Sequence, residues 1–405
     1  MFSLSLPTAS AERDSLVIAL MLEDGAARSV FSQIIKGFES AHPGLKVRLW
    51  VSNDTGYKEE IRRLLASKNG PDIVYWQAGR SLEHFVNMGL IEPIDDVWQH
   101  ENWDRAFPPN IKEVVSVNAK VFGLPYSYYS WGFYYRKSIL KKYKLPPPVS
   151  WNDFLLTCET LKENGITPIT IGTKYPWTTG SWFDYLNLRI NGLQFHRNLL
   201  KGDISFNDPR VEKVFEHWKV IIDENYFLQN HRELSWRESI PYVYRGLAGM
   251  TLIGNFAAAN LHAELSEDVG FFRFPIVDET IGSFEEAPTD ALIIPRNSSN
   301  KKSAKAFLKM VANGEAMASL NDALGTMSPH TDSPVSNKLL SHHGVELLKS
   351  ADGYSQYFDR DSNNEFATSG FDALARFMEK PDTKHVIEEL EAARLKFLRP
   401  EPPGH

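Results

Sequence analysis

Hydrophobic and polar positions follow two different periods along the first part of the chain. Continuous or alternating apolar runs are typical of strands, whereas apolar residues that recur every three or four positions indicate helices. In order, the segments are a strand at 15–20, a helix at 30–38, a strand at 45–51, a helix at 57–67 and a strand at 72–76. This order predicts parallel strand pairing with right-handed crossovers, and therefore an α/β unit at the N-terminus.

A second unit is predicted after residues 122–125, and it opens with a segment rich in tyrosine and tryptophan. A helix is expected from Trp151, because Ser150 can cap its N-terminus and Asp153 follows at the third helical position. Further helices are predicted at 138–143, 211–224, 303–312 and 384–397, and further strands at 270–274 and 291–295.

Composition narrows the class of protein. The chain has 405 residues, of which 42% are hydrophobic and 23% charged, so it can bury a sizeable core and is not globally disordered. A net charge of −7 argues against a nucleic-acid-binding protein, whose surface would be basic. The apolar runs fall short of the roughly 20 residues that span a bilayer. Cys158 is the single cysteine, which excludes an intrachain disulfide, and its place on an apolar helix face predicts a core thiol.

No motif for a cofactor or a catalytic centre is present in the sequence. The chain lacks the nucleophile elbow G-x-S-x-G, the Walker A phosphate loop and the dinucleotide motif G-x-G-x-x-G. His342 and His343 have no partner at zinc-ligand spacing, and the run that begins at Asp359 departs from a calcium loop at its glycine and glutamate positions. The sequence therefore predicts no catalytic residue, no metal site and no cofactor.

The two ends of the chain differ from the rest. Residues 1–11 are uncharged and end in Ala9-Ser10-Ala11, the small-x-small pattern of a signal-peptidase site. A basic start and a long apolar stretch are missing, so we interpret 1–11 as an incomplete export leader, with a disordered N-terminus as the alternative. Export would place the protein in the periplasm. Residues 399–405 are interpreted as a tail outside the fold.

Short segments spread over nearly the whole chain occur in the order of one known family. They are FESAHPG at 38–44, GPDIV at 70–74, KVFGLPY at 120–126, WGFYY at 131–135, WNDF at 151–154, GITPI at 165–169, RGLAGM at 245–250 with GNF at 254–256, and AKAFL at 304–308. Together they resemble extracellular solute-binding protein family 1, the sugar-binding receptors of ABC importers, which include maltose-binding protein. The chain departs from the family pattern at Asn255-Phe256 and at 288–290, which affects the choice of sugar rather than the fold.

The resemblance implies an α/β fold of the type II periplasmic binding protein class, with two lobes joined by crossing hinge segments around a ligand cleft. It implies an N-terminal lobe formed by 12–122 and 266–313, and a C-terminal lobe formed by 123–265 and 314–398. It also implies a carbohydrate ligand, the membrane permease of an ABC transporter as partner, and a monomer that is not integral to the membrane.

A sugar-binding site needs particular side chains. A pyranose presents an apolar C–H face to an aromatic ring, and its hydroxyl groups need planar polar partners, because an unpaired buried polar group costs about 1–3 kcal/mol. Trp177 and Trp182 flank a Thr-Thr-Gly-Ser run that we interpret as a loop. The candidate ligand-binding residues are Trp76, Gln77, Tyr128, Trp131, Trp177, Trp182, Asp184, Asn255, Phe256, Asp290, Tyr357 and Asp359. The remaining tryptophans, Trp236 among them, are assigned to packing.

Two other functions stay open at this point. A carbohydrate-active enzyme such as a glycosidase would use similar aromatic residues together with two carboxylates about 5–9 Å apart. A receptor for a non-sugar solute, such as a polyamine or a metal ion, would need an acidic box or a ligand cluster, and neither stands out in the sequence.

Overall fold

The computed structural model describes residues 15–22, 25–52, 54–260, 265, 267–334 and 339–398. Its contacts divide the chain into two compact units, each built from two stretches of sequence. Unit 1 consists of Met1–Tyr128 and Thr289–Val335, and unit 2 consists of Tyr129–Pro288 and Ser336–His405. The chain therefore passes between the units three times.

Unit 1 contains a five-stranded sheet with the order β2-β1-β3-β12-β6 and a small hairpin formed by β4 and β5. The strands are β1 (Ser15–Met21), β2 (Lys46–Ser52), β3 (Ile73–Gln77), β4 (Ser116–Val117), β5 (Lys120–Val121), β6 (Gly123–Tyr128) and β12 (Thr289–Ile293). β1 pairs in parallel with β2 and with β3, which confirms the pairing predicted from the order of the elements. β12 is antiparallel to both β3 and β6.

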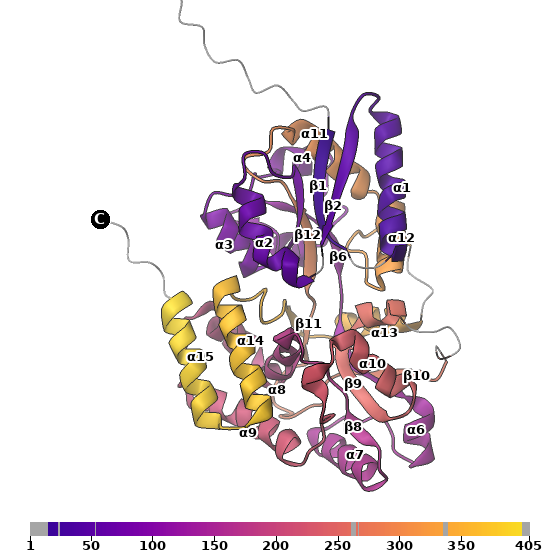
Figure 1. Cartoon of the computed structure of the whole chain (residues 1–405), viewed down its shortest axis with the longest axis vertical. Helices are drawn as coiled ribbons and strands as arrows, with labels where there is room; N and C mark the ends of the chain where they lie inside the picture. Colours follow the sequence, from indigo (N-terminus) through magenta and orange to yellow (C-terminus); the bar gives the residue numbers. More distant parts are fainter. Residues whose placement is uncertain are drawn as a thin grey trace, which may run out of the picture. The chain divides into compact units, whose positions relative to one another are not determined.

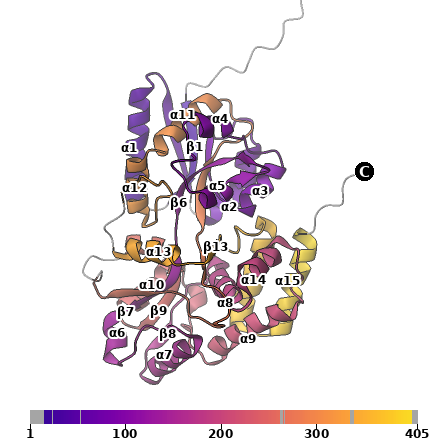
Figure 2. The ribbon, with the colours of Figure 1, turned by 180° about the vertical axis from the view of Figure 1, so that it is seen from behind.

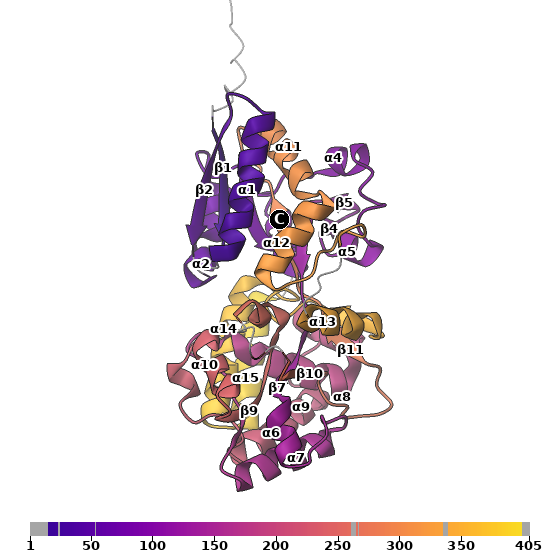
Figure 3. The ribbon, with the colours of Figure 1, turned by 90° about the vertical axis from the view of Figure 1, so that its right-hand side faces the viewer.

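The helices of unit 1 cover this sheet. They are α1 (Gly25–Ala41), α2 (Asp54–Ala66), α3 (Arg80–Asn87), α4 (Asp95–His100), α5 (Pro109–Glu113), α11 (Lys301–Val311) and α12 (Gly314–Leu324). α11 and α12 lie beside α1, as Figures 1 and 3 show, and the rings of Phe38 and Phe307 meet edge to face at 5.2 Å. Residues 314–335 thus belong to unit 1, although the sequence-based boundary assigned them to the other lobe.

Unit 2 contains a four-stranded sheet with the order β10-β7-β9-β8 and a separate parallel pair formed by β11 and β13. The strands are β7 (Trp131–Arg136), β8 (Thr167–Ile169), β9 (Ala248–Gly254), β10 (Val269–Phe272), β11 (Phe284–Glu286) and β13 (Gly353–Ser355). β10 pairs antiparallel with β7, with Phe272 opposite Phe133. This pairing is the reason why residues 266–288 belong to unit 2 and not, as expected from the sequence, to unit 1.

The helices of unit 2 pack on one another around its sheet. They are α6 (Lys137–Lys142), α7 (Trp151–Glu163), α8 (Gly180–Lys201), α9 (Pro209–Asp223), α10 (Trp236–Tyr244), α13 (Leu339–Lys349), α14 (Asn364–Glu379) and α15 (Thr383–Phe397), with the short 3-10 turns η1 (Pro176–Thr179), η2 (His231–Glu233) and η3 (Asn255–Asn260). α14 and α15 pack together and contact α8 and α9, which Figures 1 and 2 show.

The start of α7 confirms a detail of the sequence analysis. The Ser150 hydroxyl accepts a hydrogen bond from the Asp153 N–H, and the Asp153 carboxylate accepts one from the Ser150 N–H, so both halves of a capping box are present. Cys158 is fully buried on the inner face of this helix, as predicted. Among the described residues, no helix combines the length and the apolar character that a membrane span requires.

Candidate ligand-binding site

The structure places the candidate residues in two groups, one in each unit. The group in unit 1 consists of Trp76, Gln77, Tyr128 and Asp290. The group in unit 2 consists of Trp131, Trp177, Trp182, Asp184, Asn255, Phe256, Tyr357 and Asp359.

In unit 1, neighbouring strands bring Gln77 and Asp290 together. They are register partners on β3 and β12, and the Tyr75 hydroxyl donates a hydrogen bond to the Asp290 carboxylate at 3.0 Å. Trp76 differs, because its ring is fully buried, lies edge to face with Phe85 at 5.4 Å and donates its indole N–H to a backbone carbonyl. Packing in the core of unit 1 is therefore the role that the structure supports for Trp76.

Trp182 does not lie in a loop, and that prediction is wrong. It lies in the first turn of α8 and is fully buried, with the rings of Phe133 and Phe227 at 5.8 Å and 5.0 Å. Gly180, which favoured the loop interpretation, begins this helix with ordinary right-handed backbone angles. A Cβ at Gly180 would lie 2.8 Å from the Phe371 ring, so this glycine permits close packing of α8 rather than a flexible turn.

Aromatic side chains from five separate segments gather in unit 2. Trp131, at the start of β7, stacks on Tyr357 with 4.9 Å between the ring centroids and 14° between the planes. The edges of Trp177 and Phe256 meet Trp131 at 6.1 Å and 5.9 Å. Trp236, at the start of α10, contacts Phe256 at 5.2 Å. We call these five residues the aromatic cluster.

A glycine helps to form the aromatic cluster. Trp131 pairs with Gly254 where β7 meets the end of β9, and Asn255 and Phe256 follow directly. A Cβ at Gly254 would lie 2.3 Å from the Phe256 ring, so only a glycine lets this ring fold back over the strand end. The GNF segment therefore sets the position of Phe256.

Polar groups with planar geometry lie next to the aromatic cluster. Asn255 is fully buried, and neither its amide oxygen nor its amide nitrogen has a hydrogen-bond partner among the described residues. The indole N–H of Trp131 is likewise buried without an acceptor in the described part of the chain. The Arg360 guanidinium lies over the Tyr129 ring and donates a hydrogen bond to the Tyr129 hydroxyl at 2.7 Å. Aromatic faces, an amide and a guanidinium are the groups that a sugar ring needs.

Tyr357 is held in place at its hydroxyl group. It donates a hydrogen bond to the Trp177 carbonyl at 2.7 Å and accepts one from the Ser181 N–H at 3.1 Å. Burial raises the pKa of Tyr357 well above its ordinary value, and nearby carboxyl groups add to that effect, so the phenol stays neutral. The segment that carries Tyr357 continues into Asp359, which is also buried.

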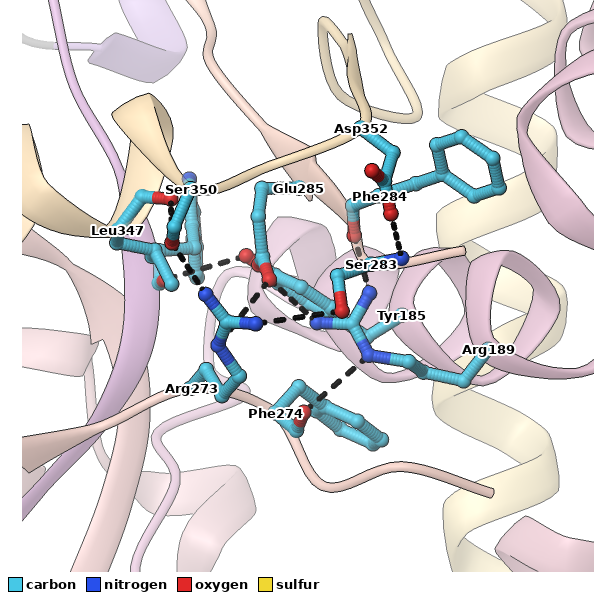
Figure 4. Close-up of polar contacts among 11 residues, drawn as sticks. Tyr185, Arg189, Arg273, Phe274, Ser283, Phe284, Glu285, Leu347, Ser350 and Asp352 are labelled. Carbon is cyan, nitrogen blue, oxygen red and sulfur yellow. Dashed lines mark hydrogen bonds and ion pairs between the residues drawn. The ribbon is translucent and has the colours of Figure 1, made fainter. Parts of the chain in front are cut away.

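Consecutive glutamates on β11 are both fully buried. Glu285 forms an ion pair with Arg189 of α8 at 2.7 Å, and Figure 4 shows Arg189 also reaching the carbonyl groups of Phe274 and Phe284. On the other side of Glu285, Arg273 donates a hydrogen bond to the Ser350 hydroxyl at 2.6 Å. Burial raises the pKa of Glu285, and the arginines counteract that effect.

Glu286 meets a second carboxyl group, that of Asp184 on α8. Both side chains are fully buried, and none of their four oxygens accepts a hydrogen bond of ordinary geometry from an N–H or hydroxyl group of the described residues. Burial raises the pKa of both groups well above their ordinary values, and the neighbouring charge of Asp184 raises the pKa of Glu286 further. The nearest ring nitrogen, His196 Nε2, lies 3.8 Å from Asp184, but burial lowers the pKa of His196 to about 3, so it is neutral.

Several of these residues were not predicted from the sequence. Trp236 was assigned to packing, and Arg360 stands between two aspartates in a run that was compared with a calcium loop. Glu286 carries no sequence signal at all, because two adjacent glutamates usually indicate a solvated surface. Among the described residues, no group of three or more histidine, cysteine, aspartate or glutamate side chains is arranged to hold a metal ion.

Comparison with known proteins identifies the family to which this chain is similar. The model of the bacterial extracellular solute-binding proteins matches residues 24–318. An uncharacterised ABC transporter extracellular-binding protein of Pyrococcus horikoshii is 27% identical over 337 residues, which cover 82% of this chain and 75% of that protein. A multiple sugar-binding protein of Streptococcus mutans is 21% identical over 328 residues, 78% of this chain and 75% of the relative.

Solved structures show the same fold. A chitin oligosaccharide binding protein superimposes with a TM-score of 0.88 at 20% identity, covering 95% of this chain and 98% of its own. The bacterial solute receptor AcbH, described as having an exclusive preference for β-D-galactopyranose, reaches a TM-score of 0.86 at 24% identity, with 94% and 98% coverage. These similarities confirm the predicted fold class and the predicted family resemblance. The chain belongs to the family of bacterial extracellular solute-binding proteins.

Proposed function

We propose that this chain is the substrate-binding component of an ABC transporter, which captures a mono- or oligosaccharide and delivers it to a membrane permease. The observation that carries the proposal is the aromatic cluster of unit 2, with the stacked pair Trp131 and Tyr357 beside the side-chain amide of Asn255, which has no hydrogen-bond partner among the described residues. A sugar supplies what these groups lack, namely C–H faces for the rings and hydroxyl groups for the amide. The names of the relatives, several of which are sugar-binding proteins, support the same ligand class.

Delivery to a permease requires the receptor to signal that it is loaded. In the resembled family this happens by hinge closure, and the sugar must then bind the closed form more tightly than the open form. To move the population from 1:99 to 99:1, that difference must be about 5.5 kcal/mol. We propose that the protein acts as an exported, periplasmic monomer with no cofactor, and that it releases its ligand unchanged.

The observations favour a receptor over a glycosidase. A glycosidase needs two carboxyl groups about 5–9 Å apart on either side of an accessible glycosidic bond. Asp184 and Glu286 are neighbouring carboxyl groups of unit 2, but both are fully buried, so neither faces an accessible glycosidic bond.

A thermal-shift screen over mono- and oligosaccharides tests the proposal, with spermidine and amino acids as non-sugar controls. A sugar present at 100 times its dissociation constant adds about 2.7 kcal/mol to the free energy of unfolding, which raises the melting temperature measurably. The same sugars are then incubated with the protein and analysed for hydrolysis. Stabilisation by a non-sugar alone, or turnover of a glycoside, would contradict the proposed function.

A further inference from the structure

We propose that Asp184 and Glu286 share one proton, and that this proton holds the segment 356–361 in the position that the sugar site requires. We call the two residues the carboxyl dyad. The inference deepens the proposed function and rests on it, because it makes sugar binding dependent on protonation at a place that the sugar does not touch. Asp184 and Glu286 are thus positioning residues rather than ligand contacts.

The packing around the carboxyl dyad favours a shared proton. A fully buried carboxylate is stable only if a cation or several hydrogen-bond donors compensate its charge. Glu285, one residue away, has this compensation from Arg189 at 2.7 Å. The carboxyl dyad has neither a cation nor a donor of ordinary geometry among the described residues. A single proton between the two groups supplies the missing donor and removes one of the two charges.

The other groups that face the carboxyl dyad disfavour a second negative charge. Glu285 on β11 and the acidic side chains that follow β13, Asp359 and Asp361, add negative potential. Tyr357 contributes a neutral hydroxyl, whereas the backbone of Phe358 has the opposite effect and lowers the pKa of Asp184, though less than burial raises it.

On the α8 side, the carboxyl dyad faces a neutral histidine with a defined tautomer. Asn191 donates to the Asn187 amide oxygen at 2.8 Å, so the Asn187 amide nitrogen faces His196 Nδ1 at 3.0 Å and donates to it. The proton of His196 is therefore on Nε2, which faces Asp184 at 3.8 Å. This polar group is too far away for a hydrogen bond, but its orientation favours one negative charge on the dyad.

Hydrogen bonds connect the carboxyl dyad to the sugar site. Ala287, next to Glu286, accepts a hydrogen bond from the Gln356 side chain at 3.0 Å and donates one to the Ser355 carbonyl at 2.9 Å. Asp361 accepts from the Gln356 N–H at 2.9 Å. Ser181, which binds the Tyr357 hydroxyl, lies one turn before Asp184 on α8. A second charge on the dyad would repel Asp359 and Asp361 and move Tyr357 away from Trp131.

The direction of the pH effect follows from the raised pKa values. A carboxyl group whose pKa is higher in the folded protein than in the unfolded chain stabilises the fold at low pH, and that contribution is lost as the pH rises through the folded-state pKa. We therefore expect sugar affinity to be retained in acid, and to fall as the pH rises through the pKa at which the dyad loses its shared proton.

The experiment compares sugar affinity by calorimetry from about pH 5 to about pH 10 in the wild type, Glu286→Gln and Asp184→Asn. We expect the wild-type affinity to fall at least about tenfold as the pH rises across this range, and the affinity of the two amide variants to stay within about twofold, because an amide N–H is a permanent replacement for the shared proton. Glu346→Gln, an exposed acidic position of unit 2, is the matched control and should keep the wild-type profile.

Two further measurements distinguish a failure of the shared proton from a failure of sugar binding. At the pH where sugar affinity is highest, the infrared spectrum should contain the carbonyl band of a protonated carboxyl group, and this band should disappear in Glu286→Gln. The melting temperature should fall in parallel with the affinity as the pH rises. A flat wild-type affinity profile, or a missing infrared band, overturns the dyad even if both amide variants fail to fold. If the protein binds no sugar at any pH, the proposed function is wrong, and so is the proposed dependence of sugar binding on the dyad. The infrared band then still decides whether Asp184 and Glu286 share a proton.

Discussion

The ring of Tyr357 stacks on the indole of Trp131, with 4.9 Å between the centroids. The two residues belong to different stretches of unit 2, one at the start of β7 and one directly after β13. A stacked pair of this kind presents a flat apolar surface. The Tyr357 hydroxyl forms hydrogen bonds with two backbone groups of the protein. The contact therefore makes the position of the late segment a direct determinant of the proposed sugar platform.

Tyr357→Phe tests how much the hydroxyl anchor contributes. The ring remains, but the Ser181 N–H and the Trp177 carbonyl lose their partner inside the protein, which costs about 1–3 kcal/mol. We expect lower sugar affinity by calorimetry and a modest decrease in melting temperature. Tyr354→Phe is the control, because its hydroxyl also binds a backbone carbonyl but lies outside the aromatic cluster. Equal loss of affinity in both variants would contradict the assigned role.

Trp177→Ala and Trp182→Ala should have different effects. Trp177 is partly exposed at the aromatic cluster, so its loss should weaken sugar binding about tenfold or more and change the stability little. Trp182 is fully buried among phenylalanines, so its loss should lower the free energy of unfolding by about 3–5 kcal/mol. Chemical denaturation and calorimetry on both variants distinguish the two roles. A Trp182→Ala protein that is stable but binds sugar weakly would indicate that Trp182 contacts the ligand.

Arg189→Met should destabilise unit 2 strongly. It leaves Glu285 as a buried carboxylate without its closest cation, and breaking a buried pair in this way costs about 3–5 kcal/mol. Because the variant raises the pKa of Glu285 further, the decrease in the free energy of unfolding should be small in acid and grow as the pH rises. Lys219→Met, which breaks an exposed pair with Asp223, should change the stability by about 1 kcal/mol at most. A similar small effect of Arg189→Met would show that the buried pair is dispensable.

Cys158 should be protected from thiol reagents in the folded protein. It is fully buried, and burial raises the pKa of its thiol well above the ordinary value, so the reactive thiolate is scarce and inaccessible. We expect labelling to proceed only through unfolding, and therefore to accelerate sharply across the denaturation midpoint. Fast labelling of the native protein would contradict the packing of α7.

The sequence predicted those parts of the fold in which local periodicity decides the structure. The first three strands and two helices appear within a few residues of their predicted places, because each has a strong apolar pattern and a clear breaker at its end. The capping box at Ser150 was recognisable for the same reason, since all its atoms lie within four residues.

The candidate site was harder to predict because tertiary contacts determine it. Gly180 and its Thr and Ser neighbours look like a loop, but packing against Phe371 makes them the start of a helix. The pairing of β11 with β13 brings Glu286 close to residues that follow much later in the chain. No local pattern reports such a contact, so neither the stacking of Tyr357 nor the burial of Glu286 could be read from the sequence.

The division of unit 2 into two stretches has a consequence for the nascent chain. β11 and α8 are synthesised well before β13, α14 and α15, and the intervening residues 289–335 belong to unit 1. The early half of unit 2 therefore has an exposed apolar surface on α8 and α9 until the last two helices emerge. We therefore expect unit 2 to complete its folding only after these two helices have been synthesised.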